Sequence, residues 1–119
     1  VLCADRKNLT WELFESCGVP REDYERCRIV GAGHLPEFSA LMERRGHFDN
    51  DILRQELVDL ARDLVQQNPD MGAILLECSD MPPYAADIQR EVALPVYDFI
   101  SMIKYAQSVV AQRPYYGFM

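Results

Sequence analysis

Apolar residues recur at helical spacing along residues 50–67. One stripe gathers the apolar side chains, and most charged side chains lie away from it; the stripe comprises Ile52, Leu53, Leu57, Leu60, Ala61 and Leu64. Asp49 or Asn50 is placed to cap the first turn, and Asn68-Pro69-Asp70 to end the helix. The pattern therefore predicts an amphipathic helix over 50–67.

Weaker versions of the same pattern predict four more helices, over 11–17, 36–45, 84–92 and 99–112. The prolines Pro82 and Pro83 can open the third of these, because a first-turn proline loses no intrahelical hydrogen bond. Asp98 is positioned to cap the last one. We expect that last helix to turn one face inward, formed by Phe99, Met102, Ile103, Ala106, Val109 and Val110.

Short apolar runs between these helices predict four strands, over 1–4, 27–30, 72–77 and 94–97. The run at 72–77 shows no polar alternation, which is typical of a strand covered on both faces. Strands that alternate with helices favour a parallel sheet with right-handed crossovers. The predicted fold class is α/β, a three-layer sandwich with a mainly parallel four-stranded sheet and helices on both faces.

The length of 119 residues and the 49% hydrophobic content fit one domain over 1–119, ending in an aromatic tail over 114–119. The net charge of −7 and the scattered arginines argue against a nucleic-acid-binding protein. The longest apolar run, 73–76, is far shorter than the roughly 20 residues of a membrane helix. We therefore expect a soluble, cytoplasmic protein.

The four cysteines and two histidines lack the spacing of a structural metal site, so we expect no metal and four free thiols. The chain opens on apolar residues without an initiating Met, from which we expect that another segment precedes it.

Candidate chemistry lies where the predicted strands end, because ligands of parallel α/β folds gather beyond the carboxyl ends of the strands. Cys78 ends a central strand just before a helix, whose dipole should favour its thiolate. Ser79 adds a hydroxyl and an N–H suited to a substrate carboxylate, whereas the charges of Glu77 and Asp80 oppose ionisation of the thiol. The alternative is that Cys78 is a small buried hydrophobe.

Three other strand-end groups have structural alternatives to a role in a site. Cys3 could face the same cleft or be a buried structural thiol. His34 could approach the cleft or bond to backbone, and Asp5 and Asp98 could bind a ligand or cap helices.

Residues 72–85, Gly-Ala-Ile-Leu-Leu-Glu-Cys-Ser-Asp-Met-Pro-Pro-Tyr-Ala, followed by Leu-Pro-Val-Tyr-Asp at 94–98, resemble the second half of the aspartate/glutamate racemase superfamily. The start of the chain, Val1-Leu2-Cys3-Ala4-Asp5 through Thr10, is similar to the loop of that superfamily whose threonines line the cleft. The resemblance covers half of the superfamily's usual length. It departs from the usual pattern at Glu77, Ser79 and Asp80.

The resemblance implies one lobe of a two-lobe, cofactor-independent racemase, with Cys78 as one of two acid/base cysteines. It implies that Ser79, Asp80 and Asp5 contact a small carboxylate or amino-acid substrate, and that a missing N-terminal lobe, or a second copy in a homodimer, supplies the opposing thiol. Two alternatives stay open. One is a related cysteine-dependent isomerase or decarboxylase acting on hydantoin, maleate or arylmalonate. The other is a non-catalytic lobe that binds small acids or a partner.

Overall fold

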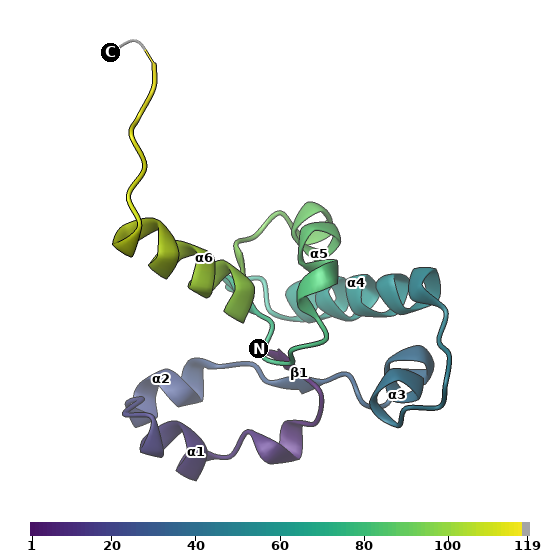
Figure 1. The fold of residues 1–119 in the computed structure, drawn as a ribbon. Helices are drawn as coiled ribbons and strands as arrows, with labels where there is room; N and C mark the ends of the chain where they lie inside the picture. The colour runs from purple at the N-terminus through teal and green to yellow at the C-terminus, as the bar shows by residue number, and fades with distance from the viewer. Residues whose placement is uncertain (118–119) are drawn as a thin grey trace.

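The computed structural model describes residues 1–117 as a mixed α/β fold (Figure 1). Phe118 and Met119, at the end of the predicted aromatic tail, lie outside the described residues. In chain order the elements are β1 (Leu2–Cys3), η1 (Arg6–Asn8), α1 (Trp11–Ser16), α2 (Arg21–Arg26), β2 (Val30–Gly31), α3 (Pro36–Met42), α4 (Asn50–Gln67), β3 (Ile74–Leu75), η2 (Pro82–Tyr84), α5 (Ala85–Val92), β4 (Val96–Tyr97) and α6 (Phe99–Val110).

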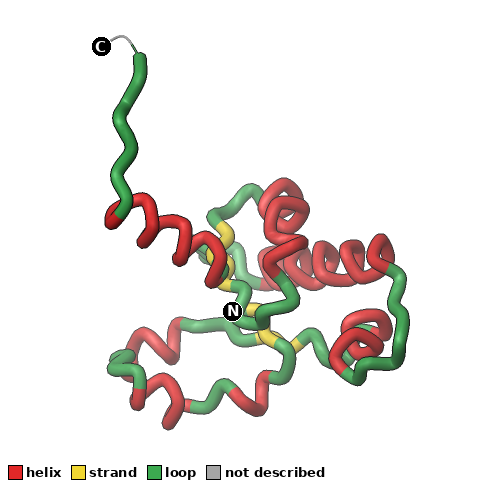
Figure 2. The backbone as a smooth tube through the Cα atoms, in the orientation of Figure 1, coloured by secondary structure: helices red, strands yellow, loops and turns green. Residues whose placement is uncertain are grey.

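The strands form two parallel pairs, which Figure 2 shows as short yellow segments near the centre of the molecule. β1 pairs with β2, and β3 pairs with β4. A single parallel bridge between Leu2 and Leu76 joins the two pairs, where the Glu77 N–H donates to the Leu2 carbonyl at 2.8 Å. The predicted four-stranded sheet is therefore wrong. The strands are parallel as expected, but each has only two residues, and the single bridge between Leu2 and Leu76 does not join the two pairs into one continuous sheet.

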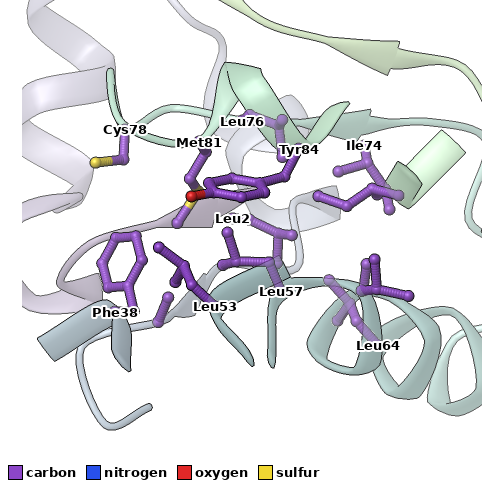
Figure 3. Close-up of a cluster of buried hydrophobic side chains, with 14 residues drawn as sticks. Leu2, Phe38, Leu53, Leu57, Leu64, Ile74, Leu76, Cys78, Met81 and Tyr84 are labelled. Carbon is purple, nitrogen blue, oxygen red and sulfur yellow. The ribbon is translucent and has the colours of Figure 1, made fainter. Parts of the chain in front are cut away.

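The hydrophobic core lies between the strands and the helices α3, α4 and α5. Figure 3 shows Leu53, Leu57 and Leu64 of α4 on one side of the cluster, with Leu2 of β1 and the bridge residue Leu76 above them. All five are at most 6% exposed. Burying a side chain of this size contributes about 1.5–3 kcal/mol. This half of the molecule therefore holds most of the stabilisation that burial provides.

Carboxylates fix the two helices that meet at this core. The Asp49 side chain accepts the N–H groups of Asp51 and Ile52, which confirms the predicted cap of α4. Glu56 on α4 accepts the N–H groups of Glu37 and Phe38 at 3.0 and 3.1 Å, and so satisfies the first turn of α3. Glu37 in turn accepts the Asp49 N–H at 2.7 Å. Each helix start is thus tied to a carboxylate of the other element.

The predicted second layer of helices is wrong for α6. Asp98 caps this helix as expected, and the Ser101 N–H donates to its carboxylate at 2.7 Å. The face predicted to turn inward is nevertheless open, with Met102 65% exposed and Val110 83% exposed. On the strands, Leu75 and Tyr97 are also exposed. Within residues 1–117, α6 buries none of its side chains, because no other described element packs over its apolar face.

Candidate functional site

The strand ends that carry the predicted chemistry lie at one edge of the molecule. Both strand pairs are parallel, and the bridge between Leu2 and Leu76 is parallel too, so all four carboxyl ends point the same way. Ala4 and Cys78 each lie two residues beyond that bridge, toward the same edge. Asp98 follows β4 at the same edge.

Cys78 lies at the border of the core and is 8% exposed. Its sulfur points away from Met81 and Leu76, as Figure 3 shows. The thiol donates to the Asp80 carboxylate, with 3.8 Å between Sγ and Oδ2. The Cys78 carbonyl accepts the Met81 N–H at 3.1 Å, which holds the turn that leads into η2. Cys78 is therefore a member of the core cluster whose thiol also contacts a carboxylate at the edge of that cluster.

Burial raises the pKa of the Cys78 thiol above its ordinary value, and the charges of Asp80 and Glu77 raise it further. The Asp80 backbone N–H acts in the opposite direction. The sequence predicted a thiolate favoured by the helix dipole, and the direction of the pKa shift corrects that expectation. The helical turn starts only at Pro82, four residues beyond Cys78, whereas burial and two carboxylates act at the sulfur itself. The opposition of Glu77 and Asp80 was expected and is confirmed.

Cys3 is fully buried on the neighbouring strand, and its thiol donates to the Val30 carbonyl at 3.4 Å. Burial raises the pKa of this thiol to about 11, and the charge of Glu77 adds to the shift. A thiol that is buried, bonded to backbone and hard to ionise fits the structural alternative for Cys3.

The three predicted substrate-binding residues are exposed, and they do not share one hollow. Ser79 lines a hollow of about 510 Å³, here called the Ser79 hollow, together with Pro82, Asp98, Phe99 and Lys104. Asp5 lines a larger hollow of about 930 Å³, here called the Trp11 hollow, together with Ala4, Thr10, Trp11, Tyr24 and His34. Asp80 lines neither of them and instead accepts the Cys78 thiol.

Two strand-end residues also make the structural contacts that were their alternatives. The Asp5 carboxylate accepts the Lys7 N–H at 2.9 Å, and so caps η1. His34 Nδ1 lies 3.0 Å from the Gly31 carbonyl oxygen. These contacts leave the binding roles of Asp5, Ser79 and Asp80 as predictions.

Several residues that line the two hollows were not identified from the sequence. Trp11, Arg21 and Tyr24 belong to the hairpin of α1 and α2, and α2 itself was not predicted. Its segment contains only one apolar residue, so hydrophobic periodicity has little to detect. The start signals were present, however, in Pro20 followed by the first-turn acids Glu22 and Asp23.

Neither a metal cluster nor a membrane-spanning helix occurs in the described part of the chain, residues 1–117. These residues contain no group of three or more His, Cys, Asp or Glu side chains arranged to hold a metal ion. No helix among them has the length and apolar character needed to cross a bilayer.

The chain is similar to dimethylsulfoniopropionate lyases. It is 30% identical over 121 residues to dimethylsulfoniopropionate lyase 5 of Emiliania huxleyi (strain CCMP1516), in a match that covers 98% of this chain and 24% of the lyase. It is 31% identical to lyase 7 of the same organism, over 87% of this chain and 31% of the lyase. It is 29% identical to the dimethylsulfoniopropionate lyase of Durusdinium sp. clade D, over 87% of this chain and 34% of the lyase.

The chain therefore spans about a quarter to a third of the length of these curated relatives. The relatives are enzymes, and they belong to the aspartate/glutamate racemase superfamily, which residues 72–85 resemble. Their names describe lyases, so they do not support the predicted isomerase activity. No protein-family profile matches the chain. No solved structure matches it either.

Proposed function

We propose that this chain supplies the proton-abstracting base of a lyase that acts on dimethylsulfoniopropionate, and that Cys78 is that base. The observation that carries the proposal is the similarity to lyases of this substrate across 98% of the chain, a span that includes position 78. The location of Cys78 supports it, because its thiol lies at the carboxyl edge of the strands, beside the Asp80 carboxylate.

The proposed reaction is a β-elimination. The Cys78 thiolate takes a proton from the carbon next to the substrate carboxylate, and the electrons of that C–H bond form a carbon–carbon double bond. The bond from the β-carbon to sulfur breaks, and its electron pair leaves with neutral dimethyl sulfide. Acrylate is the other product. The step needs one base on one face of the substrate, which a single thiol can provide.

Asp80 has a defined part in this proposal. Its carboxylate is the hydrogen-bond acceptor of the Cys78 thiol, so it holds the thiol in position and influences the pKa of the sulfur. The same carboxylate raises the pKa of Cys78. A raised pKa makes the thiolate a stronger base but reduces its population at neutral pH. Activity should therefore rise with pH toward the alkaline side of an ordinary thiol.

The predicted racemase is the second candidate, favoured by the resemblance of residues 72–85. Elimination and racemisation share their first step, removal of the proton next to the carboxylate. Racemisation then needs an acid on the opposite face, for which we propose a thiol of another lobe or of a second copy of the chain. The two functions therefore differ in the step after proton removal, which is loss of dimethyl sulfide in one and reprotonation in the other. The third candidate, a lobe that only binds small acids, predicts no proton removal at all.

The deciding experiment is a hybrid enzyme, in which this chain replaces the matching segment of Emiliania huxleyi lyase 5. We expect it to release dimethyl sulfide from dimethylsulfoniopropionate, measured in the headspace. Cys78→Ala should reduce the rate by about 10²–10⁴-fold, the usual contribution of a positioned base. Cys17→Ala is the matched control, because Cys17 is exposed and distant in sequence from the site.

Three results would overturn the proposal. One is a Cys78→Ala hybrid that keeps its turnover. Another is a hybrid that is folded by circular dichroism and releases no dimethyl sulfide. A hybrid that exchanges the α-proton of aspartate or glutamate with D₂O, without acting on dimethylsulfoniopropionate, would favour the racemase instead.

The role of Asp80 has a separate test in the chain itself. Removing its charge in Asp80→Asn should lower the pKa of Cys78, because a charge that disfavours the thiolate is lost. Alkylation of Cys78 by iodoacetamide, followed by mass spectrometry across pH, should then reach its midpoint at a lower pH than in the wild type. Asp70→Asn is the control, since Asp70 is not among the groups that shift this thiol. An unchanged or higher midpoint would remove Asp80 from the mechanism.

A further inference from the structure

The Trp11 hollow contains a pair of aromatic rings that already holds a cation. The ring of Trp11 in α1 and the ring of Tyr24 in α2 lie 5.5 Å apart, with 57° between their planes. The guanidinium of Arg21 lies over both, with its central carbon 4.8 Å from the Trp11 centroid and 5.7 Å from the Tyr24 centroid. These distances are within the range of cation–π attraction, so the pair presents electron-rich faces to a positive charge.

The rings are fixed more firmly than the cation. Trp11 and Tyr24 are half-buried, and Phe14 packs edge-on against Tyr24 with 5.0 Å between centroids. The Arg21 side chain is 57% exposed, and among residues 1–117 its one salt bridge is to Glu25, one turn along the same helix. An exposed pair of this kind contributes little to stability. Arg21 can therefore leave the rings at small cost, whereas the rings remain in place.

The hollow has the rest of what a small zwitterion needs. Its volume is about 930 Å³, and it carries side chains of both signs, including Arg6, Lys7 and Asp5. Ala4, which lines the hollow, and Cys78, which does not, each lie two residues beyond the bridge between the strand pairs, toward the same edge. A ligand seated on the rings thus lies on the same edge of the molecule as the thiol.

We infer that Trp11 and Tyr24 form a binding site for the sulfonium group of the substrate, and that Arg21 occupies this site until the sulfonium displaces it. The inference rests on the proposed function for the identity of the substrate. A sulfonium carries its charge on a sulfur surrounded by methyl groups, as a quaternary ammonium does on nitrogen, and aromatic faces are the usual receptors for such cations. The carboxylate of the substrate then falls toward Arg6 and Lys7.

The test uses trimethylsulfonium and tetramethylammonium as probes, because they have the cation but neither a carboxylate nor an α-proton. Trp11 is the single tryptophan of the chain, so its fluorescence reports directly on the rings. We expect both probes to quench it saturably at constant ionic strength, which tert-butanol, a neutral molecule of similar size, should not do.

Substitution of Arg21 gives the clearest result. If Arg21 competes with the probe for the rings, its removal should strengthen probe binding, whereas if Arg21 only supports the structure, its removal should weaken probe binding. Arg21→Gln should tighten binding of trimethylsulfonium about two- to fivefold, the equivalent of one exposed cation–π contact. Arg21→Lys, which keeps a cation, should stay near the wild type. Arg26→Gln is the matched control, since it removes a positive charge from the same helix but pairs with Asp23 rather than with the rings.

Loss of the rings should abolish binding. Trp11→Leu removes the fluorophore, so binding of the probe to this variant is measured by the NMR line width of the probe. Circular dichroism confirms that the variant is folded. The same method with Tyr24→Leu tests the second ring.

The inference is overturned if Arg21→Gln binds trimethylsulfonium no better than Arg26→Gln, or if a folded Trp11→Leu chain binds it as the wild type does. Failure of the proposed function would be detected by a different measurement, the release of dimethyl sulfide by the hybrid enzyme. A hybrid enzyme without dimethyl sulfide release, together with tighter probe binding in Arg21→Gln, would leave the sulfonium site in place and remove the lyase. If the hybrid releases dimethyl sulfide but these substitutions do not change probe binding, the lyase function is supported and the sulfonium site is rejected.

Discussion

The helices α4 and α6 have similar sequence patterns and opposite surroundings. Both are amphipathic, and an aspartate caps each of them. α4 buries five side chains against the strands and α5, whereas α6 buries none. The comparison shows that periodicity in a sequence identifies an apolar face but does not identify what covers it. The helix with a covered face should contribute to global stability, and the helix with an open face should respond only locally.

The largest effect is expected in the core beneath α4. Leu57→Ala removes a fully buried side chain and leaves a cavity, which should cost about 2–5 kcal/mol of unfolding free energy in urea denaturation. Ile52→Ala on the same helix is the control, because Ile52 is 51% exposed and should change the value by less than about 0.5 kcal/mol. Equal losses for the two would mean that α4 is not packed as described.

A second effect comes from the buried thiol of the packed half. The pKa of Cys3 is raised to about 11, so the folded state favours the protonated thiol. Its contribution to stability is full below the ordinary thiol pKa and is lost as the pH rises toward 11, by up to about 2 kcal/mol. Urea denaturation between pH 8 and about 11 should show this loss, and Cys3→Ala should reduce it. The exposed Cys17, changed to alanine, should leave the pH dependence as it is.

The cap of α6 should produce a smaller and more local effect. Asp98→Ala removes the acceptor of the Ser101 N–H, which is worth about 1 kcal/mol at a helix start. Because α6 has no packed face, we expect faster amide exchange confined to its residues, with the exchange of α4 unchanged. Asp49→Ala at the start of α4 should instead lower the unfolding free energy of the whole domain. A global loss from Asp98→Ala would show that α6 belongs to the cooperative core.

The smallest effect is expected on the open face of α6. Met102→Ser and Val110→Ser alter side chains that are mostly exposed, so each should change the unfolding free energy by less than about 0.5 kcal/mol. The measurement is urea denaturation at two protein concentrations. A loss above 1 kcal/mol that appears only at the higher concentration would show that a second copy of the chain covers this face.

The parts of the fold that could be predicted are those set by local signals. The start of α4 follows from Asp49, and its end from Pro69, so its bounds agree with the prediction. The cap of α6 was predicted for the same reason. The burial of α6 and the extent of the sheet depend on contacts between distant segments, which a single sequence does not contain. The segment of α2 has little apolar periodicity, so it was missed.

The same distinction between local signals and distant contacts applies to the candidate site. The place of Cys78 at a strand end could be predicted, because it depends on where an apolar run stops. The direction of its pKa shift could not, because it depends on how far the sulfur is buried and on how near Asp80 approaches. The aromatic pair of Trp11 and Tyr24 depends on two helices folding onto each other. Neither ring had a spacing signal that pointed to the other.

The single bridge between Leu2 and Leu76 also affects how firmly the two strand pairs are held together. It is the one backbone pairing between the two strand ribbons among residues 1–117. A single backbone bridge resists separation less than a continuous ladder would, so the contact between the ribbons depends on the packing of side chains such as Leu2. Cys3 lies on one side of this bridge and Cys78 on the other, and separation of the ribbons would remove the burial that raises the pKa of both thiols.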